Sequence, residues 1–197
     1  MFCRRMSRLS GTSKHTVHFQ NYVLKTKIAS REIVCGKSYV EKCVQFGQIC
    51  YISMKFCSSN YATASKRPKL TITYTNSDQK CVTIKPDALA GKDAFVFEKD
   101  PNVNAGNSVD FLSFAWSFSG TPYVGQSLIG FNLSQVPTNV TVTDARLSLY
   151  HNPTSSSSGQ SGSNEAELKE IMTSWDEATV TWNNKPTTSS AGSITLA

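Results

Sequence analysis

The chain has 197 residues, of which 39% are hydrophobic and only 17% are charged, and its formal net charge at pH 7 is +6. This length suffices for one well-packed domain or a small pair, and the hydrophobic share excludes a disordered chain. No apolar run reaches the roughly 18 residues of a membrane-spanning helix, so we predict no membrane insertion.

The charge is distributed unevenly along the chain. Residues 1–80 carry 14 Lys and Arg against 3 Asp and Glu, whereas residues 81–197 carry 6 against 11. A basic arm of this kind can bind nucleic acid. Here, however, the basic residues are scattered, without the helical stripe or the aromatic-interleaved strand that follows phosphates. We therefore predict no nucleic-acid partner.

The N-terminal residues 1–48 predict no well-defined element, because their alternation is brief and their turns are irregular. The start is basic but lacks the apolar run of a signal peptide. Two interpretations remain open: a cytoplasmic product, or an internal piece of a longer secreted protein. Six cysteines precede residue 82, and their spacing fits no zinc motif, which leaves disulfides and unpaired thiols both open.

From residue 49 onward the pattern is that of short strands between turn signals. The turn in "NSDQ" predicts an antiparallel hairpin between 69–75 and 80–86. The remaining predicted elements are strands at 50–56, 93–99, 109–116, 127–134, 145–151 and 178–182, loops at 117–126 and 152–164, and a short helix at 165–172. This succession predicts an all-β, jelly-roll-like antiparallel β-sandwich.

The segment "SWDEATVTWNNKP" (174–186) is unusually rich in tryptophan and carboxylates. On a strand, Val180 and Trp182 share one face, which predicts that Trp182 is buried in the main core. Asp176 and Glu177 are adjacent, so a strand directs them to opposite faces, where they cannot flank one glycosidic bond. No GxSxG nucleophile motif occurs. We predict a protein that is not an enzyme and has no catalytic residues.

Five motifs carry a family resemblance: "DAFVFEKDPNVNAGNS", "GTPYVGQSLIGFNLSQVP", "DARLSLYHNP", "GSNEAELKEIMTSW" and "DEATVTWNNKPTT". Together they resemble the DNRLRE-type domain, a jelly-roll module of secreted and surface-attached bacterial proteins that is similar to carbohydrate-binding modules. The resemblance implies an extracellular or cell-surface location within a larger protein, and polysaccharide or a cell-surface glycan as the partner. The chain departs from the family pattern at Gln126 and Glu170, where a basic residue is usual, and at Asn132, where a carboxylate is usual.

The resemblance also predicts how the chain is divided. Residues 49–75 resemble the end of such a module, and 81–197 resemble the first two thirds of the next one, so neighbouring modules of a parent protein are expected partners. Alternatively, 49–197 form one permuted sandwich. Contacts of "ISMKF" with "SLIGF" or "LSLY" in one core favour permutation.

The candidate ligand site lies in the predicted loop 117–126. Trp116 and Tyr123 border this loop, where Gly120 and Pro122 reverse the chain, and Gln126 supplies an amide. Apolar sugar faces stack on rings while amides bind hydroxyls, so these three residues predict a weak glycan platform. No cofactor is predicted. A structural Ca²⁺ near the acidic residues 87, 93, 98, 100 and 110 is an open alternative, because no calcium-loop motif fixes their spacing.

Overall fold

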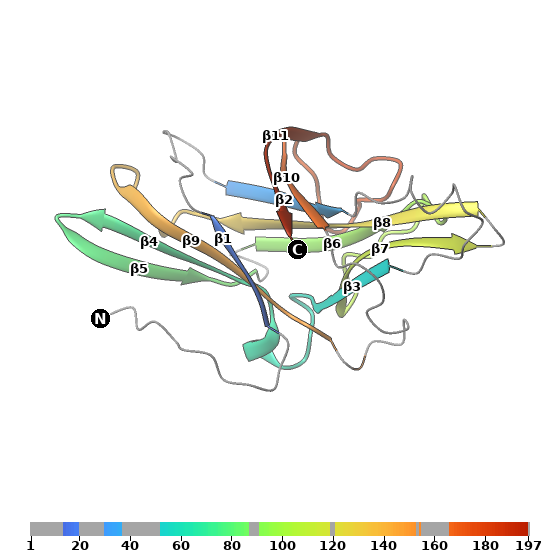
Figure 1. Ribbon diagram of the computed structural model, residues 1–197, viewed down its shortest axis with the longest axis horizontal. Coiled ribbons are helices and arrows are strands. Elements are labelled where there is room, and N and C mark those ends of the chain that lie inside the picture. Colours follow the sequence, from blue (N-terminus) through green and yellow to red (C-terminus); the bar gives the residue numbers. More distant parts are fainter. Residues whose placement is uncertain are drawn as a thin grey trace.

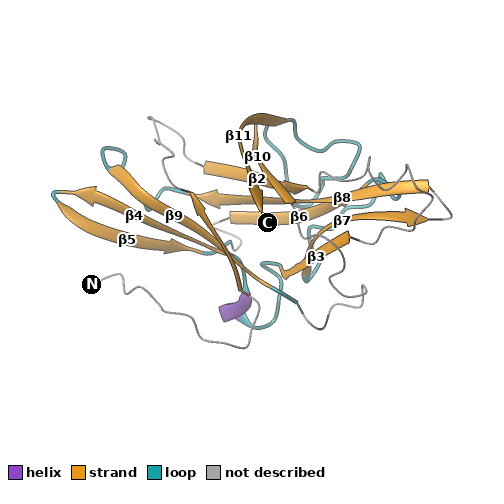
Figure 2. Cartoon of the chain, in the orientation of Figure 1, coloured by secondary structure: helices purple, strands orange, loops and turns teal. Residues whose placement is uncertain are grey.

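The computed structural model describes residues 14–19, 30–36, 52–86, 91–118, 121–152, 154 and 166–196. Within these ranges the fold consists of antiparallel strands, which confirms the all-β sandwich (Figure 1). The 3-10 helix Ala64–Lys66 is drawn in purple in Figure 2. The described strands form two sheets, here named sheet A and sheet B.

Sheet A has the strand order β1-β9-β4-β5. These strands span Lys14–Phe19 (β1), Thr141–Tyr150 (β9), Lys69–Asn76 (β4) and Asp78–Ile84 (β5). The predicted hairpin is confirmed, since β4 pairs with β5 from Leu70 opposite Ile84 to Asn76 opposite Asp78. The turn is tighter than expected because Ser77 adopts a left-handed φ of 61°.

Sheet B has the strand order β11-β10-β2-β8-β7-β3, and β6 also pairs with β8. Its strands span Ile52–Cys57 (β3), Ser30–Gly36 (β2), Gly91–Phe97 (β6), Asp110–Phe118 (β7), Thr121–Asn132 (β8), Ala166–Ile171 (β10) and Thr188–Leu196 (β11). The predicted helix at 165–172 is wrong. Its residues form β10, which pairs with both β2 and β11, so that tertiary pairing overrides the helical propensity of Glu, Leu and Lys.

The main core lies between the two sheets. Strand alternation places every second residue of β4, β8 and β9 on the inner side, where it is buried. The buried members of this core are Phe56, Leu70, Ile72, Tyr74, Ile84, Phe111, Ile129, Phe131, Leu133, Leu147, Leu149 and Leu168. Each fully buried aliphatic or Phe side chain contributes about 1.5–3 kcal/mol relative to its exposed state. Residues from "ISMKF", "SLIGF" and "LSLY" therefore share one core.

A second, smaller core covers the opposite face of sheet B. Ala94, Val96 and Leu128 of the sheet are buried there with Trp175 and Val180, which come from the connection between β10 and β11. Since β8 carries Ile129 in the main core and Leu128 in the second core, its two faces are both covered. The tryptophan-rich segment thus packs on the outside of the sandwich.

The predicted strand at 178–182 and the main-core position of Trp182 are both wrong. Trp182 is half-buried and packs against the second core. A strand at 178–182 would need its backbone N–H and C=O groups for pairing with a neighbouring strand. In the structure, several of these groups form hydrogen bonds within the 174–186 segment itself. Asp176 O accepts from Val180 N at 2.9 Å, and Asn184 Oδ1 accepts from Thr181 N at 2.6 Å. Short polar side chains that bond nearby backbone compete with strand formation in this way.

Strands β1 and β2 were not expected, because residues 1–48 lack a clear period. Their partners explain why they form: β1 pairs with β9 along its whole length, and β2 pairs with β8 and β10. Pairing to strands far along the chain is invisible to local pattern. Most of the predicted loop at 152–164 lies outside the described residues. Asp87, one of the acidic residues considered for calcium, also lies outside them.

Candidate functional site

The predicted loop 117–126 is in fact the end of the β7–β8 hairpin. Trp116 is the register partner of Tyr123, and Ser117 is the partner of Pro122. Strand β8 already begins at Thr121, so Tyr123 lies on a strand and not in a loop. The hairpin brings two of the three predicted site residues to directly opposite positions. The side chain of Trp116 lies outside the described residues.

Three aromatic residues from three strands meet on this hairpin, and we call Phe97, Phe114 and Tyr123 the aromatic strip. The ring centroids of Phe97 and Phe114 are 4.9 Å apart with an interplanar angle of 67°, and those of Phe97 and Tyr123 are 6.5 Å apart at 75°. Both are edge-to-face arrangements, which aromatic pairs favour. Phe114 is buried, while Phe97 and Tyr123 are half-buried. The strip therefore runs from the interior to the surface.

Gly125 makes the aromatic strip possible. It is the register partner of both Phe97 and Phe114, so it lies between their strands. A Cβ atom at this position would come 2.3 Å from Phe114 Cε1, closer than real Cβ contacts allow. The ring of Phe114 thus lies directly over the backbone of Gly125. An isolated glycine inside a strand pattern signals such a close approach, and this signal in "VGQ" could have located the strip.

Gln126 does not join Tyr123. The two residues are three positions apart on β8, and successive side chains of a strand alternate between faces. Gln126 is the register partner of Val96, which is buried in the second core, whereas Tyr123 contacts Phe97 on the other face. The structure therefore separates the predicted amide from the predicted aromatic.

A carboxylate lies on the face of sheet B opposite the strip. Glu98 follows Phe97 directly, and its backbone N donates to Val124 O at 3.1 Å. In return, Glu98 Oε2 accepts from Val124 N at 3.1 Å. Side chains of a strand alternate between faces, and Glu98 interacts electrostatically with Lys185 at the second core, so this exposed carboxylate does not join Phe97 and Tyr123.

Each of the two tryptophans of the 174–186 segment has a lysine ammonium over one face of its ring. Lys92 Nζ lies 4.4 Å from the centroid of the Trp175 ring, and Lys185 Nζ lies 3.5 Å from that of Trp182. Trp175 is buried in the second core, and the half-buried Trp182 packs against it. Both rings therefore contribute to the packing of this segment on sheet B.

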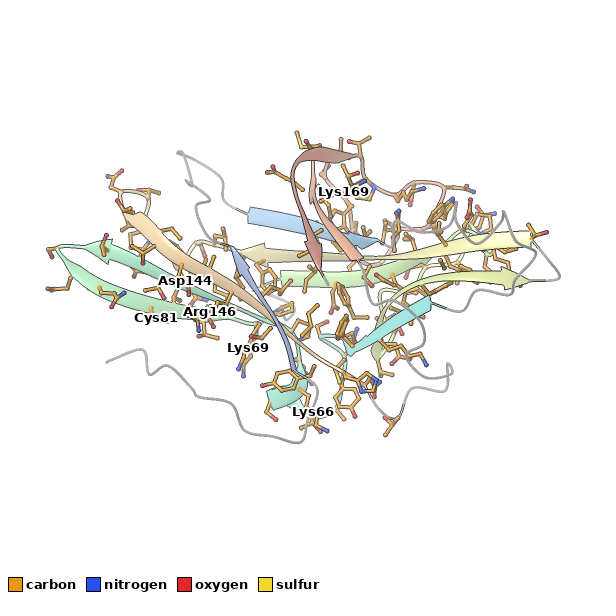
Figure 3. All side chains as sticks on the ribbon, viewed as in Figure 1. Lys66, Lys69, Cys81, Asp144, Arg146 and Lys169 are labelled. Carbon is orange, nitrogen blue, oxygen red and sulfur yellow. The ribbon has the colours of Figure 1, made fainter. Side chains whose placement is uncertain are left out.

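Sheet A carries a second group of polar side chains, and Figure 3 labels Lys69, Asp144 and Arg146 among them. Arg146 Nε lies 2.7 Å from Asp144 Oδ2. The half-buried Tyr150 stands at one end of β9, and Lys69 Nζ lies 5.8 Å from the centroid of its ring. The neighbouring β4 and β5 contribute threonine hydroxyls, such as Thr71 Oγ1, which lies 3.2 Å from Thr83 Oγ1.

The carboxylates do not assemble a metal or catalytic site among the described residues. No group of three or more His, Cys, Asp or Glu able to hold a metal ion occurs there. Asp93 is buried and accepts hydrogen bonds from Ser59 N at 2.7 Å and Ser59 Oγ at 2.5 Å. Burial raises the pKa of Asp93 to about 6. Glu177 Oε1 accepts from Asp93 N, and burial raises its pKa too.

These carboxylates are connected to backbone and not directed at an open cleft. Glu177 and Asp93 tie the 174–186 segment to β6, and Asp110 Oδ1 accepts from Asn152 Nδ2 at 2.6 Å. Such bonds stabilise loops, and they occupy the oxygens that a general acid or a calcium ion would need. Their arrangement is structural.

The described strands form a β-sandwich with an aromatic strip that reaches its surface. Comparison with known families places the protein among binding modules: the model described as carbohydrate-binding module family 96 matches residues 85–197. Because this match covers more than half of the chain, the protein belongs to carbohydrate-binding module family 96. No curated protein and no solved structure gives a significant match. Among the described residues, no helix is long and apolar enough to span a membrane.

Proposed function

We propose that the protein is a non-catalytic module that binds polysaccharide through the aromatic strip, with Tyr123 as the residue in contact with the sugar. The observation that carries the proposal is the strip itself, whose half-buried end consists of the rings of Phe97 and Tyr123. Apolar sugar faces stack on such rings. The register pairs Trp116 with Tyr123, and we include Trp116 in the proposed site.

The proposed binding is weak. Aromatic contacts of this type contribute about 0.5–1.5 kcal/mol each, so one module binds in the micromolar to millimolar range. Repetition of the module in a larger protein would strengthen attachment by raising the effective concentration. The proposal therefore includes a location at the cell surface or outside the cell, as one of several DNRLRE-type modules of a parent protein.

A structural spacer without a ligand is the second candidate function. The half-burial of both Phe97 and Tyr123 favours it, because rings packed at their edges stabilise a hairpin even with no sugar present. The two functions predict different results for a folded variant that lacks one ring: glycan binding predicts weaker retention on polysaccharide, whereas a spacer predicts no retention before or after the change.

The test is retention of the purified protein on a panel of insoluble polysaccharides. The variants are Tyr123→Ala and, as a matched control, Tyr150→Ala, which removes an equally half-buried tyrosine from sheet A. We expect Tyr123→Ala to lose retention by about tenfold, corresponding to roughly 1.4 kcal/mol, and Tyr150→Ala to keep it. Equal retention of both folded variants would contradict the site, and retention of the unmodified protein on no member of the panel would support the spacer.

A further inference from the structure

The strand at the centre of sheet A comes from outside the segment that matches the family. That segment begins at residue 85, whereas β4 ends at Asn76. Strand β4 lies between β9 and β5, and it pairs with β9 from Lys69 opposite Ser148 to Thr75 opposite Thr141. Without the β4–β5 hairpin, β9 would have one edge unpaired and its apolar side chains uncovered on one side.

The same region supplies a large part of the main core. Leu70, Ile72 and Tyr74 alternate along β4 and are buried, together with Phe56 of β3 and Ile84 of β5. They pack against the inward side chains of β8 and β9, which belong to the family segment. Loss of these side chains would remove the inner layer that covers Ile129 and Leu147, because a β-sandwich core needs both sheets.

Strand β3 adds a second line of pairing, at the edge of sheet B. It pairs with β7 from Ile52 opposite Ala115 to Cys57 opposite Asp110. Asn152, which follows the end of β9, donates from its backbone N to Lys55 O of β3 at 3.1 Å. This bond also joins β3 to the end of β9. Both sheets of the family segment are thus extended by strands of residues 52–84.

Polar contacts of the loop after β3 fix this segment in place. Ser59 donates twice to the buried carboxylate of Asp93, and Asn60 Nδ2 donates to Gly106 O at 2.8 Å. Ser58 Oγ donates to Ser108 O at 2.5 Å. These bonds have directional requirements, so they specify one position of the segment and not merely apolar burial.

We propose that residues 52–84 are a complementing segment: the edges of β7 and β9 and the inward side chains of β8 and β9 form a surface whose partner is this segment of the same chain. The recognition element is the pattern Leu-x-Ile-x-Tyr on β4, presented by a hairpin whose other face is polar. The segment stays bound to the rest of the protein even when the peptide chain is cut between Pro86 and Gly91. This inference concerns assembly of the fold and is independent of glycan binding.

The test uses the full chain with two engineered protease sites, one within residues 41–49 and one replacing residues 87–90. After cleavage of the folded protein, we expect the released segment to co-elute with the other fragments in gel filtration and to separate only in denaturant. Separation in native buffer, or precipitation of the remainder after cleavage, would overturn the proposal.

Two substitutions test whether the buried side chains of β4 keep the segment bound. In the cleavable chain, Ile72→Asp introduces a charge into the main core, whereas Thr71→Asp places the same charge on the outer face opposite Arg146. We expect the segment to be lost from the complex with Ile72→Asp and kept with Thr71→Asp. If the Ile72→Asp chain fails to fold before cleavage, Ile72→Ala takes its place, and we then expect partial loss. Full retention with Ile72→Ala would contradict the inference.

Discussion

Lys92 and Trp175 form a double contact: the ammonium lies over the indole ring, 4.4 Å from its centroid, and donates a hydrogen bond to the backbone O of the same residue. Lys185 repeats this arrangement on Trp182, with Nζ 3.5 Å from the ring centroid and 3.4 Å from the backbone O. Each lysine therefore holds both the side chain and the backbone of its tryptophan. Lys92 comes from β6, so its contact with Trp175 joins the 174–186 segment to sheet B, whereas Lys185 holds Trp182 within the segment.

Replacement of Lys92 should destabilise the protein. Lys92→Met keeps the aliphatic stem but removes the cation–π contact, about 0.5–2 kcal/mol, and one hydrogen bond, about 0.5–1.5 kcal/mol. We expect the free energy of unfolding to fall by about 1–3 kcal/mol in urea titrations. The control is Lys99→Met, whose ammonium lies in a partly exposed pair 4.0 Å from Asp100 and which should change stability by less than about 0.5 kcal/mol. Equal effects would show that the contact with Trp175 is immaterial.

Gly106 should tolerate no side chain. A Cβ atom there would come within 2.1 Å of the backbone O of Glu177, and backbone cannot yield as a flexible side chain does. We expect Gly106→Ala to reduce the free energy of unfolding by at least about 2 kcal/mol, because the 174–186 segment must move away from the turn. The neighbouring exposed Asn107→Ala serves as control in the same thermal and urea melts. A Gly106→Ala protein as stable as the control would contradict this packing.

Gly125 should couple energetically to Phe114. Gly125→Ala forces the ring of Phe114 aside, at a cost of about 1–3 kcal/mol. In a chain that already carries Phe114→Leu, the smaller side chain leaves room for the new methyl group, and the cost should be lower by about 1 kcal/mol or more. A double-mutant cycle by urea denaturation measures this difference. Strictly additive effects would show that the ring does not lie over Gly125 in solution.

The fold was predictable from sequence where strand alternation and turn residues agree. Alternation in "KLTITYT" and the turn at "NSDQ" are local signals, and the β4–β5 hairpin follows them. The short helix at 165–172 failed because β10 depends on distant partners, and the strand at 178–182 failed because Asp176 and Asn184 bond the backbone locally. A hydrophobic pattern reveals neither the distant strand partners nor these local hydrogen bonds.

The site was predictable in part for the same reason. Trp116 and Tyr123 were singled out as bulky aromatics near a chain reversal, and the register places them opposite each other. Gln126 was assigned to a loop, where alternation does not apply, so its position on the other face could not be foreseen. The local pattern does not indicate the contact of Phe97 with Phe114, because it depends on Gly125 of a third strand, β8, which lies between β6 and β7.

Asp93 should make stability depend on pH. Its pKa in the folded protein is about 6, against an ordinary value of 3.8, so the folded state binds a proton more tightly than the unfolded state does. The stability that this group contributes is therefore fully present below pH ~4 and is lost as the pH rises through about 6, by up to about 3 kcal/mol. Glu177, whose pKa is also raised by burial, acts in the same direction.

Asp93→Asn removes this dependence while keeping the hydrogen bonds, since its Oδ1 can accept from Ser59 N and its Nδ2 can donate to Ser59 Oγ. We expect the variant to gain stability relative to the unmodified protein by about 1–3 kcal/mol between pH 4 and pH 7.5, measured by urea denaturation at each pH. The control is Asp100→Asn, which removes an exposed carboxylate on the following turn and is measured in the same way. A flat difference for Asp93→Asn would mean that the carboxylate of Asp93 is ionised in the folded protein at no cost, and that the contact with Ser59 compensates its burial.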